Sequence, residues 1–105
     1  MPGPEAGSHD DAYLTDLDAG WAELRNPAMA TGFRLDWDCA VFRWLISWQP
    51  FGGAHAMPLR GAYALGIEPW THGGNLAAAV AAGEAIGLAG GERLDTTLVA
   101  SIIDC

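Results

Sequence analysis

Hydrophobic and polar residues alternate with a period of two along much of the chain. The clearest case is residues 31–38, in which Phe33, Leu35 and Trp37 alternate with charged residues. Successive side chains of a β-strand point to opposite faces, so this pattern predicts a half-buried antiparallel strand. The charged positions of its other face are Arg34, Asp36 and Asp38.

Four further segments extend this β pattern. Residues 62–68 and 92–104 alternate in the same way, and residues 21–26 form a short run ended by a proline. Residues 41–49 are apolar on both faces, which is typical of a central strand. Residues 11–18 fit either a short strand or one helical turn. Short strands separated by turn residues predict an all-β antiparallel sandwich.

One short helix is expected within this β fold. Asn75 can cap an alanine-rich helix over Leu76–Ala82, and Gly83 follows its end. Residues 1–10 are rich in proline and glycine and are expected to be a mobile tail. Residues 11–105 would then form the β-sandwich domain.

Composition and charge exclude several classes of function. The chain has 105 residues, half of them hydrophobic and 17% charged, which indicates one globular domain. The net charge is −8, and the basic residues are five unclustered arginines. Binding to nucleic acid or to an anionic membrane requires clustered positive charge, so neither is expected as a partner.

The remaining composition argues against a metal, a cofactor or a targeting segment. The N-terminus lacks the basic and apolar regions of a signal peptide, and no apolar run approaches the ~20 residues of a membrane span. Cys39 and Cys105 are far apart, and His9, His55 and His72 have no ligand spacing. We therefore expect a cytoplasmic protein with free thiols, no metal and no cofactor.

Glu68 is the ionisable residue that most suggests chemistry. In a strand over residues 62–68 it shares a face with Ala62, Ala64 and Gly66, and these small residues leave room for a ligand above the backbone. A carboxylate at the end of such a face can act as a general base on a flat polar ligand. The commoner alternative is a solvent-facing carboxylate at the end of a strand.

Four pieces of the sequence have a distinctive order and spacing. They are WQPFGG at 48–53, LGIEPWT at 65–71, Gly83, and LAGGER at 88–93. Together they resemble the C-terminal part of the aldose 1-epimerase (galactose mutarotase-like) family, over roughly residues 12–104. The resemblance implies a large antiparallel β-supersandwich with a sugar cleft. It also implies that Glu68 is the general base that takes the proton from the anomeric hydroxyl of an aldose.

The same resemblance suggests which side chains contact the sugar. Trp70 and Trp48 could stack on sugar C–H groups, although the commoner role for a tryptophan such as Trp48 is packing in the core. Gln49 could bind a hydroxyl group, although a solvated surface residue is the commoner alternative. His72 lies four residues after Glu68 and is the better candidate of the two loop histidines.

The resemblance lacks one functional part. The catalytic acid of that family is a histidine from a segment before the matched region, and the matched residues hold no counterpart to that segment. We therefore expect a fragment, a truncated reading frame or a reduced relative. Its uncovered strand edges and apolar face predict a homo-oligomer, or pairing with the missing N-terminal half. The alternative function is a non-catalytic carbohydrate-binding or structural β-module that lacks the acid.

Overall fold

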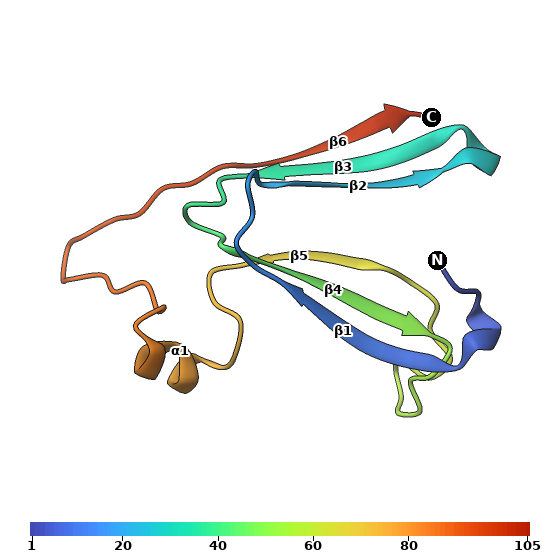
Figure 1. Cartoon of the computed structure of the whole chain (residues 1–105), viewed down its shortest axis with the longest axis horizontal. Coiled ribbons are helices and arrows are strands. Elements are labelled where there is room, and N and C mark those ends of the chain that lie inside the picture. Colours follow the sequence, from blue (N-terminus) through green and yellow to red (C-terminus); the bar gives the residue numbers. More distant parts are fainter.

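A computed structural model describes all 105 residues of the protein. It contains two three-stranded antiparallel sheets and one short helix (Figure 1). This confirms the all-β fold class and the single short helix. The first sheet has the order β1-β4-β5, and the second has the order β2-β3-β6. The first sheet comprises β1 (Ser8–Leu14), β4 (Trp44–Phe51) and β5 (Gly66–Trp70), and the second comprises β2 (Trp21–Asn26), β3 (Thr31–Trp37) and β6 (Leu98–Asp104).

The second sheet contains the strands that the sequence defines best. β2 and β3 have the expected bounds to within one residue, and β3 is the central strand. A 3₁₀ turn over Pro27–Met29 joins them, because a proline cannot continue the strand ladder. Leu35 and Trp37 are buried, while Arg34 and Asp36 point to the other face as the alternation predicts.

β4 is the central strand of the first sheet, as its apolar sequence predicts, but it starts and ends later than expected. The backbone N–H groups of Val41 and Phe42 donate to the carbonyl of Asp38, so these residues form a turn. The strand then continues to Phe51 because β1 pairs with it over its whole length, as far as Ser8 opposite Phe51.

β1 resolves the choice left open for residues 11–18 in favour of a strand, and it begins earlier than that segment. Residues 8–10 belong to β1, within the stretch that the sequence predicts as a tail. His9 lies opposite Pro50, and Asp11 lies opposite Trp48. The N-terminal residues therefore contribute side chains to the first sheet.

β5 is displaced along the chain relative to the predicted strand over residues 62–68. Continued pairing would place Ala64 opposite Pro50, and proline has no N–H with which to complete the ladder. Beyond β5 the two segments keep isolated contacts: the N–H of Ala64 donates to the carbonyl of Pro50, the N–H of Gly52 donates to that of Ala62, and Phe51 and Tyr63 form a single bridge. At its other end β5 includes Pro69, which an edge strand tolerates.

β6 is shorter than the predicted strand over residues 92–104. Its pairing with β3 runs from Asp104 opposite Thr31 to Leu98 opposite Trp37, where β3 ends. Residues 92–97 alternate in sequence but have no partner strand, so they remain outside the sheet. Strand formation therefore stops where the neighbouring strand stops.

The helix α1 (Leu76–Ala82) has the predicted bounds and caps. The side chain of Asn75 accepts a hydrogen bond from the N–H of Ala78 at 2.9 Å. Gly83 adopts a left-handed conformation at φ 72° and ends the helix. Both caps follow directly from local sequence.

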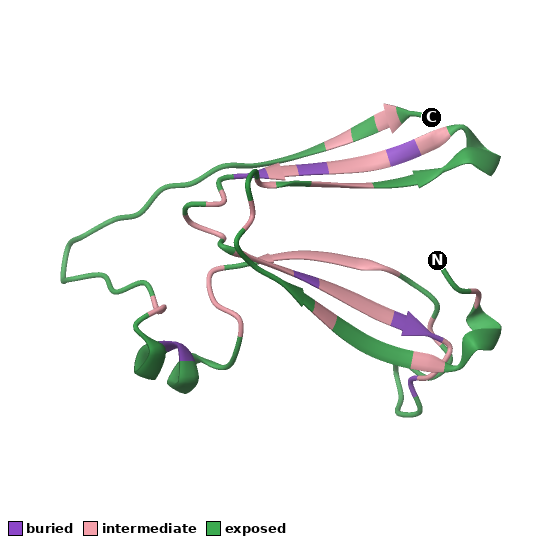
Figure 2. Ribbon diagram, viewed as in Figure 1, coloured by how far each residue is buried: buried purple, intermediate pink, exposed green.

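Few residues are buried, and most of these lie in the central strands β3 and β4 (Figure 2). Leu35 and Ile46 are buried, whereas Leu94 and Leu98 of the alternating segment 92–104 are exposed because β6 starts late and lies at an edge. Because so few residues are buried, the structure presents wide sheet faces to its surroundings. No helix is long and apolar enough to cross a membrane.

Candidate functional site

Glu68 lies on one face of the first sheet, together with the tryptophans of β4. Residues directly opposite each other in an antiparallel pair project to the same side, and Glu68 is opposite Ile46. We call this surface the Glu68 face. The register assigns to it His9, Asp11 and Tyr13 of β1, Trp44, Ile46 and Trp48 of β4, and Gly66, Glu68 and Trp70 of β5.

The carboxylate of Glu68 is held by a neutral donor. Its Oε2 accepts a hydrogen bond from the indole Nε1 of Trp70 at 3.2 Å. The residue is half-buried and forms no ion pair with any arginine or histidine. An unneutralised carboxylate of this kind keeps its capacity to accept hydrogen bonds from a ligand.

Gly66 makes room for this arrangement. An ideal Cβ at Gly66 would lie 3.0 Å from Oε1 of Glu68 and 3.0 Å from Cβ of Trp48. Contacts this tight would force Glu68 or Trp48 to shift by a few tenths of an ångström, so Gly66 lets both side chains approach the same patch of backbone. The prediction of a bare strand face beside Glu68 therefore holds at this one position.

Trp48 is half-buried rather than fully enclosed in the core, and it contacts the N-terminal strand. Its Nε1 donates to Nε2 of His9 at 2.9 Å, and the two rings meet edge to face at 6.1 Å. Nε2 of His9 is thus a hydrogen-bond acceptor in this arrangement. Together they form an aromatic surface beside Gly66.

Trp70 continues this aromatic surface past Glu68. It is 39% exposed, and its ring meets that of His72 edge to face at 5.9 Å. His72 is fixed by a 2.9 Å contact between its Nδ1 and the hydroxyl of Thr71. The structure therefore brings together Glu68, Trp70 and His72, as the sequence interpretation requires.

Gln49 is separated from this group. It follows Trp48 in β4 and so projects from the opposite face of the sheet, where its Nε2 donates to the hydroxyl of Ser47 at 3.2 Å. The sequence interpretation proposed Gln49 as a ligand of a sugar hydroxyl beside Trp48 and Glu68. Strand alternation instead places Gln49 on the far side from Glu68.

His9 and Asp11 are members of the Glu68 face that the sequence interpretation missed. The sequence interpretation placed His9 in a proline- and glycine-rich tail and gave Asp11 no role in the site. A signal was present, because His9, Asp11 and Tyr13 alternate with Ser8, Ala12 and other residues in the manner of a strand. Glycines and prolines before residue 8 obscured it.

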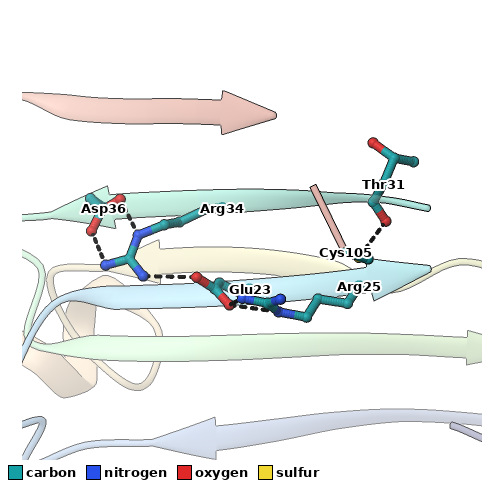
Figure 3. Close-up of polar contacts among 6 residues, drawn as sticks. All are labelled: Glu23, Arg25, Thr31, Arg34, Asp36 and Cys105. Carbon is teal, nitrogen blue, oxygen red and sulfur yellow. Dashed lines mark hydrogen bonds and ion pairs between the residues drawn. The ribbon is translucent and has the colours of Figure 1, made fainter. Parts of the chain in front are cut away.

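The second sheet carries a separate group of charges. Arg34 lies between Asp36 and Glu23, at 2.6 and 2.9 Å, and Glu23 also pairs with Arg25 at 2.7 Å (Figure 3). Hydrogen bonds from Arg34 lower the pKa of Glu23 and of Asp36. Trp21 stacks on the same guanidinium at 4.8 Å. We call these paired residues, Glu23, Arg25, Arg34 and Asp36, the charge ladder. Their charged groups bind one another, so few hydrogen-bonding groups are left for a ligand.

The Glu68 face combines a carboxylate, exposed indole surfaces and imidazole nitrogens. Aromatic rings can pack against the C–H groups of a sugar, while carboxylates and imidazoles bind its hydroxyls. No group of three or more His, Cys, Asp or Glu residues is arranged to hold a metal ion. The carboxylate and imidazole of this face offer hydrogen-bonding groups beside aromatic ring surfaces.

Comparison with known proteins gives no assignment. The chain matches no known protein family, no curated protein and no solved structure. The resemblance to aldose 1-epimerases rests on the sequence pieces described above.

Proposed function

We propose that the Glu68 face binds an aldose and that Glu68 is the general base of an aldose 1-epimerase-like reaction. The observation that supports this most directly is the position of its carboxylate. It lies over Gly66, accepts a hydrogen bond from Trp70 and has no cationic partner. Such a group is free to accept the proton of an anomeric hydroxyl.

In this reaction Glu68 removes the proton from the hydroxyl on C1 while an acid protonates the ring oxygen. The ring opens to the aldehyde, the C1–C2 bond rotates, and closure gives the other anomer. Trp48 and Trp70 would hold the ring beside the carboxylate, with His72 behind Trp70. Positioning of this kind matters because proton transfer requires hydrogen-bond reach, about 2.6–3.2 Å between heavy atoms.

The second candidate is carbohydrate binding without catalysis, because the family's histidine acid comes from a segment outside the resemblance. His9 shares the Glu68 face but its Nε2 is occupied by Trp48. We therefore expect the chain alone to show little or no mutarotation. In a protein that also supplies the acid, Glu68→Gln should lower the rate roughly 10²–10⁴-fold.

A measurement of sugar affinity tests both candidate functions and distinguishes them from a purely structural role of the protein. Glucose and galactose would be titrated into the wild-type chain, Glu68→Gln and the control Glu92→Gln, which makes the same change in an exposed turn. We expect Glu68→Gln to weaken sugar binding roughly tenfold, the usual scale for a hydrogen bond to a charged group. Equal affinity in all three proteins would contradict a role for Glu68.

Catalysis would then be measured by exchange NMR between the α and β anomers. Protein-dependent exchange that survives in Glu68→Gln would rule out Glu68 as the base. Sugar binding without exchange, in a protein that supplies the acid, would favour the non-catalytic module.

A further inference from the structure

A pocket lies at the end of the molecule where the chain crosses between the two sheets. Two short connections, residues 15–20 and 38–43, lie at this end, and the long connection that contains α1 leaves β5 there (Figure 1). The pocket has a volume of about 250 Å³, just below the range of about 300–1,000 Å³ that holds drug-sized ligands, so it suits a small molecule. It is lined by Thr15, Asp16, Leu17, Cys39, Arg43, Trp44 and Glu84.

Arg43 ties the walls of this pocket together. Its Nη2 donates to the backbone carbonyl of Glu84 and, at 3.4 Å, to that of Thr71. Its own backbone carbonyl accepts a hydrogen bond from the hydroxyl of Thr15 at 3.5 Å. The guanidinium is therefore positioned by backbone groups, while its Nε and Nη1 have no acceptor in the protein.

The pocket holds three charged groups that do not neutralise one another. Arg43 forms no ion pair, unlike Arg34, which binds two carboxylates in the charge ladder. Asp16 and Glu84 form no ion pair either, although both line the pocket beside Arg43. A guanidinium and two carboxylates are thus arranged around one cavity, with their charges free to meet those of a ligand.

These charges define the chemistry of a matching ligand. A carboxylate can accept charge-assisted hydrogen bonds from the free N–H groups of Arg43, and ammonium groups can donate to Asp16 and Glu84. One guanidinium and two carboxylates give this set a net charge of −1, and the whole chain carries −8, which favours a cationic ligand. The ligand that matches all three groups has one carboxylate and two cations.

We propose that this pocket binds a basic α-amino acid such as lysine. The α-carboxylate accepts hydrogen bonds from Arg43, and the two ammonium groups bind Asp16 and Glu84. The alkyl chain packs on the ring of Trp44, which is backed by Gly73, where a Cβ would lie 2.7 Å from Cζ2 of that ring. This site is independent of the proposed sugar function and uses other residues than Glu68.

Three probes of related structure test the charges of the ligand. L-Lysine, L-norleucine and cadaverine would each be titrated into the ¹⁵N-labelled chain at low ionic strength, with the indole N–H signal of Trp44 as the readout. L-Norleucine lacks the side-chain ammonium, and cadaverine lacks the carboxylate. We expect L-lysine to bind roughly three- to tenfold more tightly than either, between the values for an exposed ion pair and for a charged hydrogen bond.

Two variants identify the protein groups responsible. Arg43→Gln should remove the preference for L-lysine over cadaverine, and Glu84→Gln should reduce the preference over L-norleucine. Glu84→Gln keeps the backbone carbonyl that holds Arg43, so it tests the ligand contact without removing that anchor. Arg60→Gln and Glu92→Gln are the matched controls, since both residues lie in exposed loops without an ion pair, and they should leave all affinities unchanged.

The outcomes that would overturn the amino-acid site are equally specific. Equal affinities of the wild-type chain for the three probes would show that the charges of the pocket do not select the ligand. A preference for L-lysine that persists in both Arg43→Gln and Glu84→Gln would place the binding elsewhere. A Trp44 signal that responds to none of the probes would likewise exclude the site. Each of these results would leave the proposed function of the Glu68 face untouched.

Discussion

The indole N–H of Trp70 lies 3.2 Å from Oε2 of Glu68, two residues before it in the same edge strand. Side chains two residues apart in a strand share a face, so this contact follows from the strand itself. Oε2 is held by Trp70, while Oε1 lies 3.0 Å from where a Cβ of Gly66 would stand, a position equally close to Trp48 Cβ. The relationship makes the Glu68 face a single surface rather than a set of separate side chains.

Gly66→Ala should disturb this surface directly. The added methyl would lie 3.0 Å from both Glu68 Oε1 and Trp48 Cβ, so one of them must move. We expect sugar binding to be lost and the free energy of unfolding, measured in urea, to fall by about 1–3 kcal/mol. Gly87→Ala is the control, because a Cβ there meets no atom within 4 Å. Unchanged sugar affinity in Gly66→Ala would argue that the carboxylate position is unimportant.

Trp70→Phe should weaken sugar binding while it preserves the ring surface. The substitution removes the N–H that holds Glu68 and leaves an aromatic ring beside His72. We expect a loss of affinity of roughly 3–30-fold, since a net hydrogen bond contributes about 0.5–2 kcal/mol. Calorimetric titration with galactose measures it. If Trp70→Phe binds as tightly as the wild type, the hydrogen bond to Glu68 plays no part in the site.

The charge ladder of the second sheet predicts a dependence of stability on pH. Arg34 lowers the pKa of Asp36 and of Glu23 in the folded protein from ordinary values of 3.8 and 4.5. A depressed pKa stabilises the fold above the unfolded value, and the contribution is lost as the pH falls through the folded value. Arg34→Met should therefore lower Tm at neutral pH, and its difference from the wild type should shrink between about pH 5 and pH 2.

Arg93→Met is the control for this experiment. Its partner is Asp95, and their side chains are 83% and 72% exposed, so solvent screens the pair. We expect little change in Tm at any pH. A difference between Arg34→Met and the wild type that stays constant down to pH 2 would exclude the ladder as its cause.

Exposed apolar residues predict self-association. Ile102 is 78% exposed and Leu98 46% exposed on the face of β6 that lies beside Phe33 and Trp37. A dimer that covers this face would bury them. Ile102→Lys should shift the species seen by light scattering toward monomer, whereas Val99→Lys, on the opposite face of β6, should do so less. A wild-type monomer at high micromolar concentration with cooperative unfolding would contradict this prediction.

Local sequence was enough to predict those elements whose ends are set by their own residues. Asn75 and Gly83 bound the helix, and alternation defines β3. Elements whose ends depend on a partner were harder to predict. β6 stops where β3 stops, and β5 starts late because Pro50 in β4 lacks an N–H.

The contacts of the candidate site likewise fall into those set by local sequence and those set by strand pairing. Glu68, Trp70 and His72 are close in the chain, and their contacts follow from strand spacing. His9 reaches Trp48 across 39 positions of the chain through the pairing of β1 with β4. No local pattern reports that register, so the N-terminal contribution became visible only in the fold.

The most direct test of the proposed function is the response of the indole N–H resonances to sugar. In the ¹⁵N-labelled chain, titration with galactose should shift the signals of Trp48 and Trp70 together and to saturation. Trp21 is the internal control, because it stacks on Arg34 in the other sheet and should not respond. In Glu68→Gln the same shifts should need roughly tenfold more galactose. Signals of Trp48 and Trp70 that stay unmoved, or that move no more than that of Trp21, would contradict a sugar-binding Glu68 face.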